Sequence, residues 1–183
     1  MDIHPTAVVH SQAKISSGVK IGPFCLLGEN VQIGKDTILD SHVVVDRETK
    51  IGERCRLFPF VSVGGAPQAI RYGGEPTRLT IGDDNVVREF VTINRGTVEG
   101  GGETKVGNAN LIMAYSHIAH DCQVGNRVIM ANGSTLAGHI EVEDFAIVGG
   151  LVAIHQFVRV GCYAIIGGAS AAPQDIPPYM VAA

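Results

Sequence analysis

The stretch ISSGVKIGPFCLLGENVQIGKDTILDSHVVVDRETKIGERCRLFPFVSV, residues 15–63, has an aliphatic residue at every sixth position. A six-residue period does not fit an α-helix, but it fits a short strand followed by a corner. The position four residues after each aliphatic one is mostly small or β-branched. The stretch therefore predicts a series of short strands that each point one aliphatic side chain inward. Counted from the start of the chain, the series is Ile3, Val9, Ile15, Ile21, Leu27, Ile33, Leu39, Val45, Ile51, Leu57, Val63.

The six-residue register breaks at two places, which predicts loops inserted at about residues 64–80 and 95–105. After the second break the register continues in a long array. That array is Val106, Ile112, Ile118, Val124, Met130, Leu136, Val142, Val148, Ile154, Val160, Ile166. Prolines, which cannot donate to a strand ladder, follow the array. We therefore expect one β-helix domain over residues 1–178 and a short C-terminal end at 179–183.

Three six-residue units are enough to close one triangular coil of 18 residues. Successive coils then stack about 4.8 Å apart, form parallel ladders and bury their aliphatic side chains in one continuous core. The fold class is thus all-β, a parallel β-helix. The repeat itself does not fix the handedness, and the general rule for parallel crossovers favours a right-handed coil. Gly and Asn, in pairs such as Ile21-Gly22 and Gly107-Asn108, are expected at corners with positive φ.

The composition restricts the class of protein. A net charge of −4 gives no indication of a nucleic-acid partner, and no apolar run approaches the ~20 residues of a membrane span. The start of the chain has neither the basic residues nor the apolar run of a signal peptide. The four cysteines form no zinc pattern and are expected to be buried thiols in a reducing compartment. We therefore expect a soluble, cytoplasmic protein.

Four of the seven histidines lie between residues 117 and 155. His120 and His139 fall in hexads that start 18 residues apart, and His155 falls in a hexad another 18 residues on. Because three hexads make one coil, these histidines belong to the same side of three successive coils. His117 lies beside the same corner. The sequence therefore predicts four imidazoles along one edge of the solenoid.

This edge is a candidate catalytic site. An imidazole titrates near neutral pH, so His120 is a candidate general base that takes a proton from a hydroxyl. Donation of a hydrogen bond from the imidazole to the Asp121 carboxylate would fix its tautomer. Adjacent side chains of a strand point to opposite faces, so this contact requires a corner. The backbone N–H of Gly138, one coil above, is a candidate oxyanion donor. Histidines that merely decorate an exposed corner, and a zinc site, are the other interpretations.

Six short strings stand out from the repeat: GEPTR (74–78), NRGT (94–97), HIAHDC (117–122), AGH (137–139), HQF (155–157) and QDIPPY (174–179). Together they resemble the UDP-N-acetylglucosamine O-acyltransferases, and the resemblance runs the length of the chain. Hexapeptide proteins in general share the repeat but not these strings. The resemblance implies that the β-helix is left-handed.

The resemblance also implies an activity and its partners. The family transfers a 3-hydroxyacyl group from acyl carrier protein to the glucosamine 3-hydroxyl of UDP-N-acetylglucosamine, the first step of lipid A synthesis in Gram-negative bacteria. It works as a cytoplasmic homotrimer with each active site between neighbouring subunits, and it needs no metal or other cofactor. The transfer is direct, so that no serine or cysteine nucleophile is required.

Residue roles follow from the same resemblance. His120 matches the general base, Asp121 the carboxylate that supports it, and Gly138 the oxyanion donor. The positions that line the sugar-nucleotide site are His117, His139, His155 and Gln156, those in the first loop that contact substrate are Gln68 and Arg71, and the position that sets acyl-chain length is Gly168. A basic rim is expected to receive the acidic carrier protein. Its candidates are Arg71, Arg78, Arg95, Lys105 and Arg159.

The chain departs from the family at three points. It ends at Ala183, whereas the family usually continues into a C-terminal helical domain. Ala69 stands where an acidic residue is common, and Arg71 stands where lysine is common. Other functions stay open: an N-acyltransferase for an amino-sugar nucleotide, a non-catalytic trimeric scaffold, and a metal-dependent β-helix enzyme of the carbonic anhydrase kind.

Overall fold

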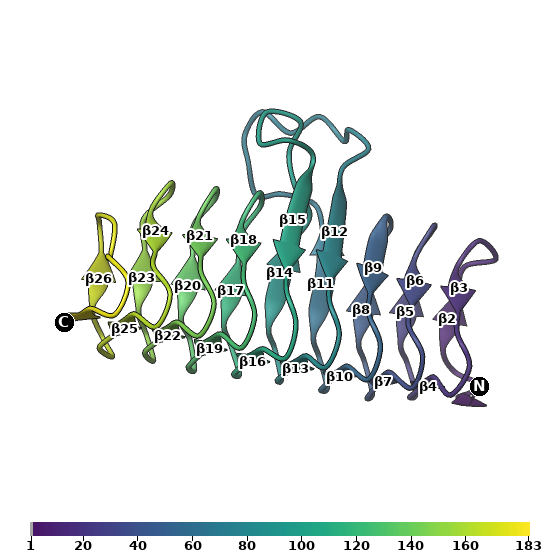
Figure 1. Cartoon of the computed structure of the whole chain (residues 1–183). Helices are drawn as coiled ribbons and strands as arrows, with labels where there is room; N and C mark the ends of the chain where they lie inside the picture. The colour runs from purple at the N-terminus through teal and green to yellow at the C-terminus, as the bar shows by residue number, and fades with distance from the viewer. Residues whose placement is uncertain (1) are drawn as a thin grey trace.

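The computed structural model describes residues 2–183 and shows a solenoid of stacked triangular coils (Figure 1). The strands form three parallel sheets, one along each side of the triangle. Sheet 1 contains β1 (Asp2–Ile3), β4 (Lys20–Ile21), β7 (Ile38–Leu39), β10 (Arg56–Leu57), β13 (Val86–Val87), β16 (Leu111–Ile112), β19 (Ile129–Met130), β22 (Ile147–Val148), β25 (Ile165–Ile166) and β27 (Val181–Ala182). Within residues 2–183 no helix is long and apolar enough to cross a membrane.

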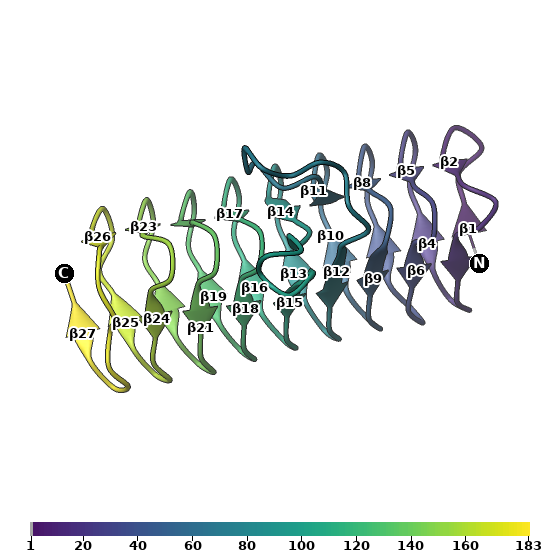
Figure 2. The same ribbon diagram turned by 90° about the horizontal axis from the view of Figure 1, so that it is seen from above.

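The other two sheets complete each coil, as the view from above shows (Figure 2). Sheet 2 contains β2 (Val8–Val9), β5 (Leu26–Leu27), β8 (Val44–Val45), β11 (Ser62–Gly65), β14 (Thr92–Asn94), β17 (His117–Ile118), β20 (Thr135–Leu136), β23 (Ala153–Ile154) and β26 (Ala171–Ala172). Sheet 3 contains β3 (Lys14–Ile15), β6 (Gln32–Ile33), β9 (Thr49–Ile51), β12 (Arg78–Ile81), β15 (Glu103–Val106), β18 (Gln123–Val124), β21 (Glu141–Val142) and β24 (Arg159–Val160). The chain runs through the three sheets in this order, so that residues 18 apart become neighbours wherever no loop intervenes.

From Ile21 onward the aliphatic series forms the buried core, as the six-residue period predicted, whereas Ile3 at the open end of the solenoid is exposed. In sheet 1, for example, Leu39 is in register with Ile21 on one side and Leu57 on the other, and all three side chains are buried. The second, smaller position of the hexad is also buried, as at Val31 and Cys55. Because every coil adds the same inward side chains, the core is a continuous column along the solenoid axis.

The corners differ from the sequence-based expectation. Positive φ angles do not fall on the glycines of the repeated pairs but two residues later, on non-glycine residues such as Phe24 (59°) and Ala109 (56°). The glycines are required for a different reason. A Cβ at Gly22 would lie 2.9 Å from the carbonyl carbon of Asp40 in the next coil, and one at Gly107 would lie 2.5 Å from the oxygen of Gly125. Close approach between coils, not backbone conformation, therefore excludes a side chain at these positions.

Two loops leave the solenoid at the corner between sheets 2 and 3. They join β11 to β12 (66–77, the first loop) and β14 to β15 (95–102, the second loop), within the two predicted insertions. Figure 1 shows them side by side above the coils, and the backbone N–H of Arg78 donates to the oxygen of Gly102 at 2.9 Å. Near the end of the chain the prolines lie between strands, and β27 pairs with β25 within the segment expected as a C-terminal end.

Candidate active site

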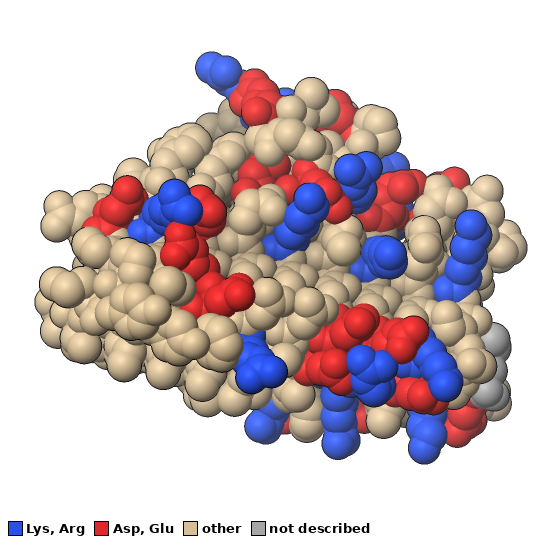
Figure 3. Space-filling view, viewed as in Figure 1, with Lys and Arg blue, Asp and Glu red and all other residues tan. Residues whose placement is uncertain are grey.

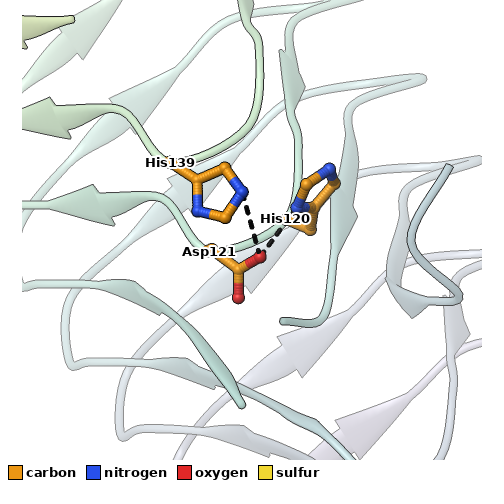
Figure 4. A group of neighbouring side chains, drawn as sticks. All are labelled: His120, Asp121 and His139. Carbon is orange, nitrogen blue, oxygen red and sulfur yellow. Dashed lines mark hydrogen bonds and ion pairs between the residues drawn. The ribbon is translucent and has the colours of Figure 1, made fainter. Parts of the chain in front are cut away.

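The site lies at the corner between sheets 2 and 3, one coil beyond the second loop. Here β17 ends at Ile118 and β18 begins at Gln123. Asp121 has a φ of 61°, so the chain turns sharply between the strands. The turn brings two consecutive side chains together: Nδ1 of His120 lies 2.7 Å from Oδ2 of Asp121 (Figure 4). The alternation of side chains in a strand does not apply at a corner, and this contact depends on that exception.

The second loop buries the Asp121 carboxylate. Its side chain is only 1% exposed. Thr97 donates its backbone N–H to Oδ1 at 2.7 Å and its hydroxyl to Oδ2 at 2.6 Å. The backbone N–H of Asp121 donates to the hydroxyl of Thr104 at 2.8 Å. Sequence reasoning assigned no role to either threonine. Thr97 lies in the second loop, outside the six-residue register, and Thr104 lies on β15 directly after that loop.

His139 occupies the same corner one coil further on. Its ring meets the His120 ring edge-on, with centroids 5.1 Å apart, and stacks on Phe157 of the next coil at 4.6 Å. Its Nε2 lies 3.8 Å from Oδ2 of Asp121 (Figure 4). His120, Asp121 and His139 thus form one cluster, built by two successive turns of the solenoid.

The other two histidines lie outside this cluster. His117 is on the outer side of β17, where its Nδ1 lies 2.7 Å from the hydroxyl oxygen of Thr92. Burial lowers the pKa of His117 below its usual value. His155 is exposed, and its Nδ1 lies 3.1 Å from the backbone oxygen of Gln156, which is also exposed. The expected stack of four imidazoles is therefore found for only two, because the histidines occupy different positions of the turn and point in different directions.

A small pocket of about 80 Å³ opens between the loops and this cluster. Its lining is Ala69, Arg71, Tyr72, Glu75, Thr97, Val98, Glu99, His120 and His139. Arg71 reaches across to Glu99 at 3.6 Å, so that the two loops meet over the pocket. Gln68, the other predicted residue of the first loop, is exposed and does not line it. Both imidazoles of the cluster therefore face a pocket that the loops complete.

Gly138 lies against the His120 ring. A Cβ at this position would be 2.6 Å from Cε1 of His120. Within residues 2–183, the backbone N–H of Gly138 donates no hydrogen bond. A free donor thus lies beside the imidazole, as an oxyanion site requires.

Gly168 lies at a different corner, between sheets 1 and 2. It lines an apolar groove of about 630 Å³ together with Tyr115, Asn132, Gly133, Gly150, Leu151 and Ala169. The six-residue register already predicts this separation. Ile118 and Ile166 are 48 residues apart, which is eight hexads and therefore not a whole number of three-hexad coils. The predicted site residues of one chain therefore fall into two separate places.

The prediction that Arg95 belongs to a basic rim is wrong. Its side chain is 3% exposed, and it donates to the oxygen of Gly64 at 2.6 Å, to Asp46 at 3.2 Å and to the hydroxyl of Tyr72 at 3.0 Å. Arg95 therefore fastens the first loop to the solenoid. The other candidates all have carboxylate partners, and Figure 3 shows basic and acidic side chains intermingled on this face.

Within residues 2–183, this cluster is the one group of side chains spaced to hold a metal ion. The ligand atoms of His120, Asp121 and His139 lie within 4.8 Å of one another. Both oxygens of Asp121 already accept hydrogen bonds from Thr97, and Oδ2 also accepts one from His120. The donor set is thus that of an imidazole oriented by a buried carboxylate, which is the arrangement of acid–base catalysis.

Comparison with known proteins agrees with the fold. The family of bacterial transferase hexapeptide (six repeats) matches residues 12–47 and 103–138. The fold and this match together define a hexapeptide-repeat transferase. The left-handed parallel β-helix implied by the sequence motifs is confirmed.

Individual relatives are more specific. An acyl-[acyl-carrier-protein]–UDP-N-acetylglucosamine O-acyltransferase of Thermodesulfovibrio yellowstonii is 55% identical over 181 residues, which are 99% of this chain and 70% of that protein. Solved UDP-N-acetylglucosamine acyltransferases of Moraxella catarrhalis and Francisella novicida are 46% and 45% identical, with TM-scores of 0.97 and 0.96. The alignments cover 98% of this chain in both cases, and 70% and 66% of those chains. The chain belongs to the UDP-N-acetylglucosamine O-acyltransferase family.

Proposed function

We propose that this chain catalyses the reaction of its family by direct transfer, with His120 as the general base. A 3-hydroxyacyl group passes from acyl carrier protein to the 3-hydroxyl of UDP-N-acetylglucosamine, which is the first step of lipid A biosynthesis. The single observation that carries the mechanism is the 2.7 Å contact between Nδ1 of His120 and the buried Asp121 carboxylate. It holds the imidazole in the tautomer whose Nε2 is free to accept a proton.

The reaction then has two steps. Nε2 of His120 takes the proton of the 3-hydroxyl while the oxygen attacks the thioester carbonyl carbon. The N–H of Gly138 stabilises the oxyanion that forms. When the carbonyl re-forms, the C–S bond breaks, and the carrier thiolate leaves and takes the proton from the imidazolium. A cysteine nucleophile is not needed, and burial raises the pKa of the neighbouring Cys122 thiol to about 12.

The predicted binding residues divide into those in or beside the pocket and those exposed outside it. Arg71 and His139 line the pocket, so we assign them to the sugar nucleotide together with His117 on the adjacent strand. Gln68, His155 and Gln156 are exposed, and we assign them to substrate contacts outside the pocket. The assignment of Gly168 to the acyl chain is supported by the apolar groove that it lines.

A homotrimer is part of the proposal, because His120 and the groove of Gly168 lie at different corners of one chain. A site between neighbouring subunits allows one acyl donor to reach both. The outer side of sheet 1 also carries a stripe of aliphatic side chains that a second copy would cover. The stripe is Val86, Leu111, Ile129, Ile147, Ile165 and Val181. We place the enzyme in the cytoplasm, as in its family.

The test is an assay of acyl transfer from 3-hydroxyacyl carrier protein to UDP-N-acetylglucosamine. His120→Ala removes the proposed base and should lower kcat by about 10²–10⁴-fold. The matched control is His10→Ala at an exposed position of the first coil, which should retain the wild-type rate. A wild-type rate in His120→Ala would disprove the assigned base.

The same assay decides between the alternatives. A parallel reaction with an amino-sugar nucleotide as acceptor tests the N-acyltransferase alternative. An assay of chelator-treated protein tests the alternative of a metal-dependent enzyme, and we expect the treated protein to keep its full activity. If the folded protein transfers no acyl group to either acceptor, the proposed function fails and the scaffold alternative gains support.

A further inference from the structure

We propose that Thr97 of the second loop is a positioning residue, which fixes the Asp121 carboxylate and through it the orientation of the His120 imidazole. The inference rests on the proposed function, because it assumes that Asp121 supports His120 as the base. Nothing in the repeat pattern or in the family strings assigned a role to Thr97.

Thr97 holds the carboxylate at two points. Its backbone N–H donates to Oδ1 at 2.7 Å and its hydroxyl donates to Oδ2 at 2.6 Å, the same oxygen that faces Nδ1 of His120. Both residues are buried, with Thr97 8% exposed. Hydrogen bonds to an ionised carboxylate are shorter and stronger than those between neutral groups. One donor on each oxygen prevents the carboxylate from rotating, so Oδ2 stays directed at His120.

The second loop is shaped to hold Thr97 in this position. The backbone N–H of Gly100 donates to the Thr97 hydroxyl oxygen at 3.1 Å, so that the single hydroxyl proton is left for Asp121. The N–H of Gly102 donates to the Thr97 backbone oxygen at 2.7 Å. A Cβ at Gly100 would meet the Asp121 carboxylate, at 2.0 Å from its carbon atom. The loop thus passes directly against the carboxylate.

The chemical consequence concerns the base. The direction of Nε2 into the pocket depends on the hydrogen bond at Nδ1, and that bond depends on where Oδ2 is held. Removal of the Thr97 hydroxyl frees Oδ2 to move. It does not change binding of the sugar nucleotide, because the other pocket residues make those contacts. We therefore expect that loss of the hydroxyl lowers kcat and leaves KM unchanged.

The experiment compares Thr97→Val, which loses the hydroxyl, with Thr97→Ser, which keeps it. Thr97→Val should lower kcat on the order of 10-fold with little change in the KM for UDP-N-acetylglucosamine. Thr97→Ser should retain most of the activity. The matched control is Thr80→Val, because the Thr80 hydroxyl also donates to a carboxylate, that of Glu103 at 2.6 Å, but away from the pocket. Its kcat should equal that of the wild type.

A double-mutant cycle separates positioning from a general effect on the loop. In an Asp121→Ala background, Thr97→Val should cause no further loss of kcat. An equal loss in both backgrounds would show that Thr97 acts without Asp121, and it would overturn the inference. If Asp121→Ala alone keeps the wild-type rate, the proposed function has failed at Asp121 instead.

A second variant covers the case in which Thr97→Val does not fold. Gly100→Ala keeps both hydrogen-bonding groups of Thr97 but pushes the carboxylate out of place. It should lower kcat in the wild-type background and have no effect in Asp121→Ala, where the clashing carboxylate is gone. Wild-type kcat in Gly100→Ala would contradict the requirement for a fixed carboxylate.

Discussion

Gly138 packs so closely against His120 that no side chain fits between them: a Cβ at Gly138 would lie 2.6 Å from Cε1 of the imidazole. The two residues belong to successive coils, and their contact is set by the stacking of the coils. Gly138→Ala should therefore displace the proposed base. Because misplacement by about 1 Å can cost about 100-fold, kcat should fall by that order.

The control for this prediction is Gly65→Ala, whose Cβ would make an ordinary contact at 3.5 Å with Asn94. Melting temperatures of both variants show whether the fold is intact. Unchanged kcat in Gly138→Ala would mean that the imidazole can move without loss of function.

Gly34 tests the reason for the glycines in the repeat. A Cβ at Gly34 would lie 2.4 Å from the carbonyl carbon of Gly52, which is backbone of the next coil and cannot move aside. Gly34→Ala should lower the free energy of unfolding by about 1–3 kcal/mol, as overpacking does. Urea unfolding of this variant beside Gly65→Ala measures the difference. Equal stability of the two variants would show that coil spacing adapts to a methyl group.

His117 should make stability depend on pH. Its pKa is lowered by burial, so the unfolded chain takes up a proton near pH 6.5 whereas the folded chain does so only at lower pH. The unfolded state therefore binds more protons below pH 6.5, and the stabilisation present above this pH is lost as the pH falls. Between about pH 7.5 and 5, the melting temperature of His117→Gln should fall less than that of the wild type. His10→Gln, at an exposed position, should lose as much as the wild type.

The four thiols should react in two classes. Cys25, Cys55 and Cys122 are buried, and burial raises the pKa of each thiol, whereas Cys162 is partly exposed. The thiolate is the reactive form, so a thiol reagent should modify one cysteine per native chain and four per unfolded chain. Cys162→Ser should abolish the reaction of the native protein. Rapid modification of Cys122 would show that the corner opens in solution.

Gly168 should limit the length of the acyl chain. It lines the apolar groove between sheets 1 and 2, and a larger side chain would fill part of that space. In Gly168→Leu the ratio of kcat/KM for a short over a long 3-hydroxyacyl donor should rise on the order of 10-fold. Ala169→Ser, a small change at the neighbouring position, serves as the control. An unchanged ratio in Gly168→Leu would place the acyl chain elsewhere.

The periodicity predicted most of the fold because it is a local property. Ile21, Leu39 and Leu57 are equivalent in the sequence and are equivalent in the core. The same arithmetic placed His120 and His139 at one corner, where they are found. It did not predict which corner residue has positive φ: Phe24 has it, whereas Gly22 is required by its close approach to Asp40.

The inserted loops account for most of what the sequence did not predict in the site. Arg95 looked like a surface charge, yet it is buried against Asp46, 49 residues away, and Gly64. Thr97 belongs to one of the family strings, but its contact was not predicted, because its partner Asp121 is 24 residues further on and the loop has no period. Contacts between a loop and a repeat have no fixed spacing, so only the structure reveals them.

The sequence by itself determined the coil, the buried column of aliphatic side chains and the family of acyltransferases. The coil and the column follow from the period, because six residues fix the same local geometry each time they recur, whereas the family follows from the six short strings that stand out from the repeat. Only the tertiary structure decided that His120 and Asp121 touch and that Thr97 holds the carboxylate. These contacts arise where the chain turns, leaves the register or stacks one coil on the next, and the directions of side chains at such places are set by the packing around them.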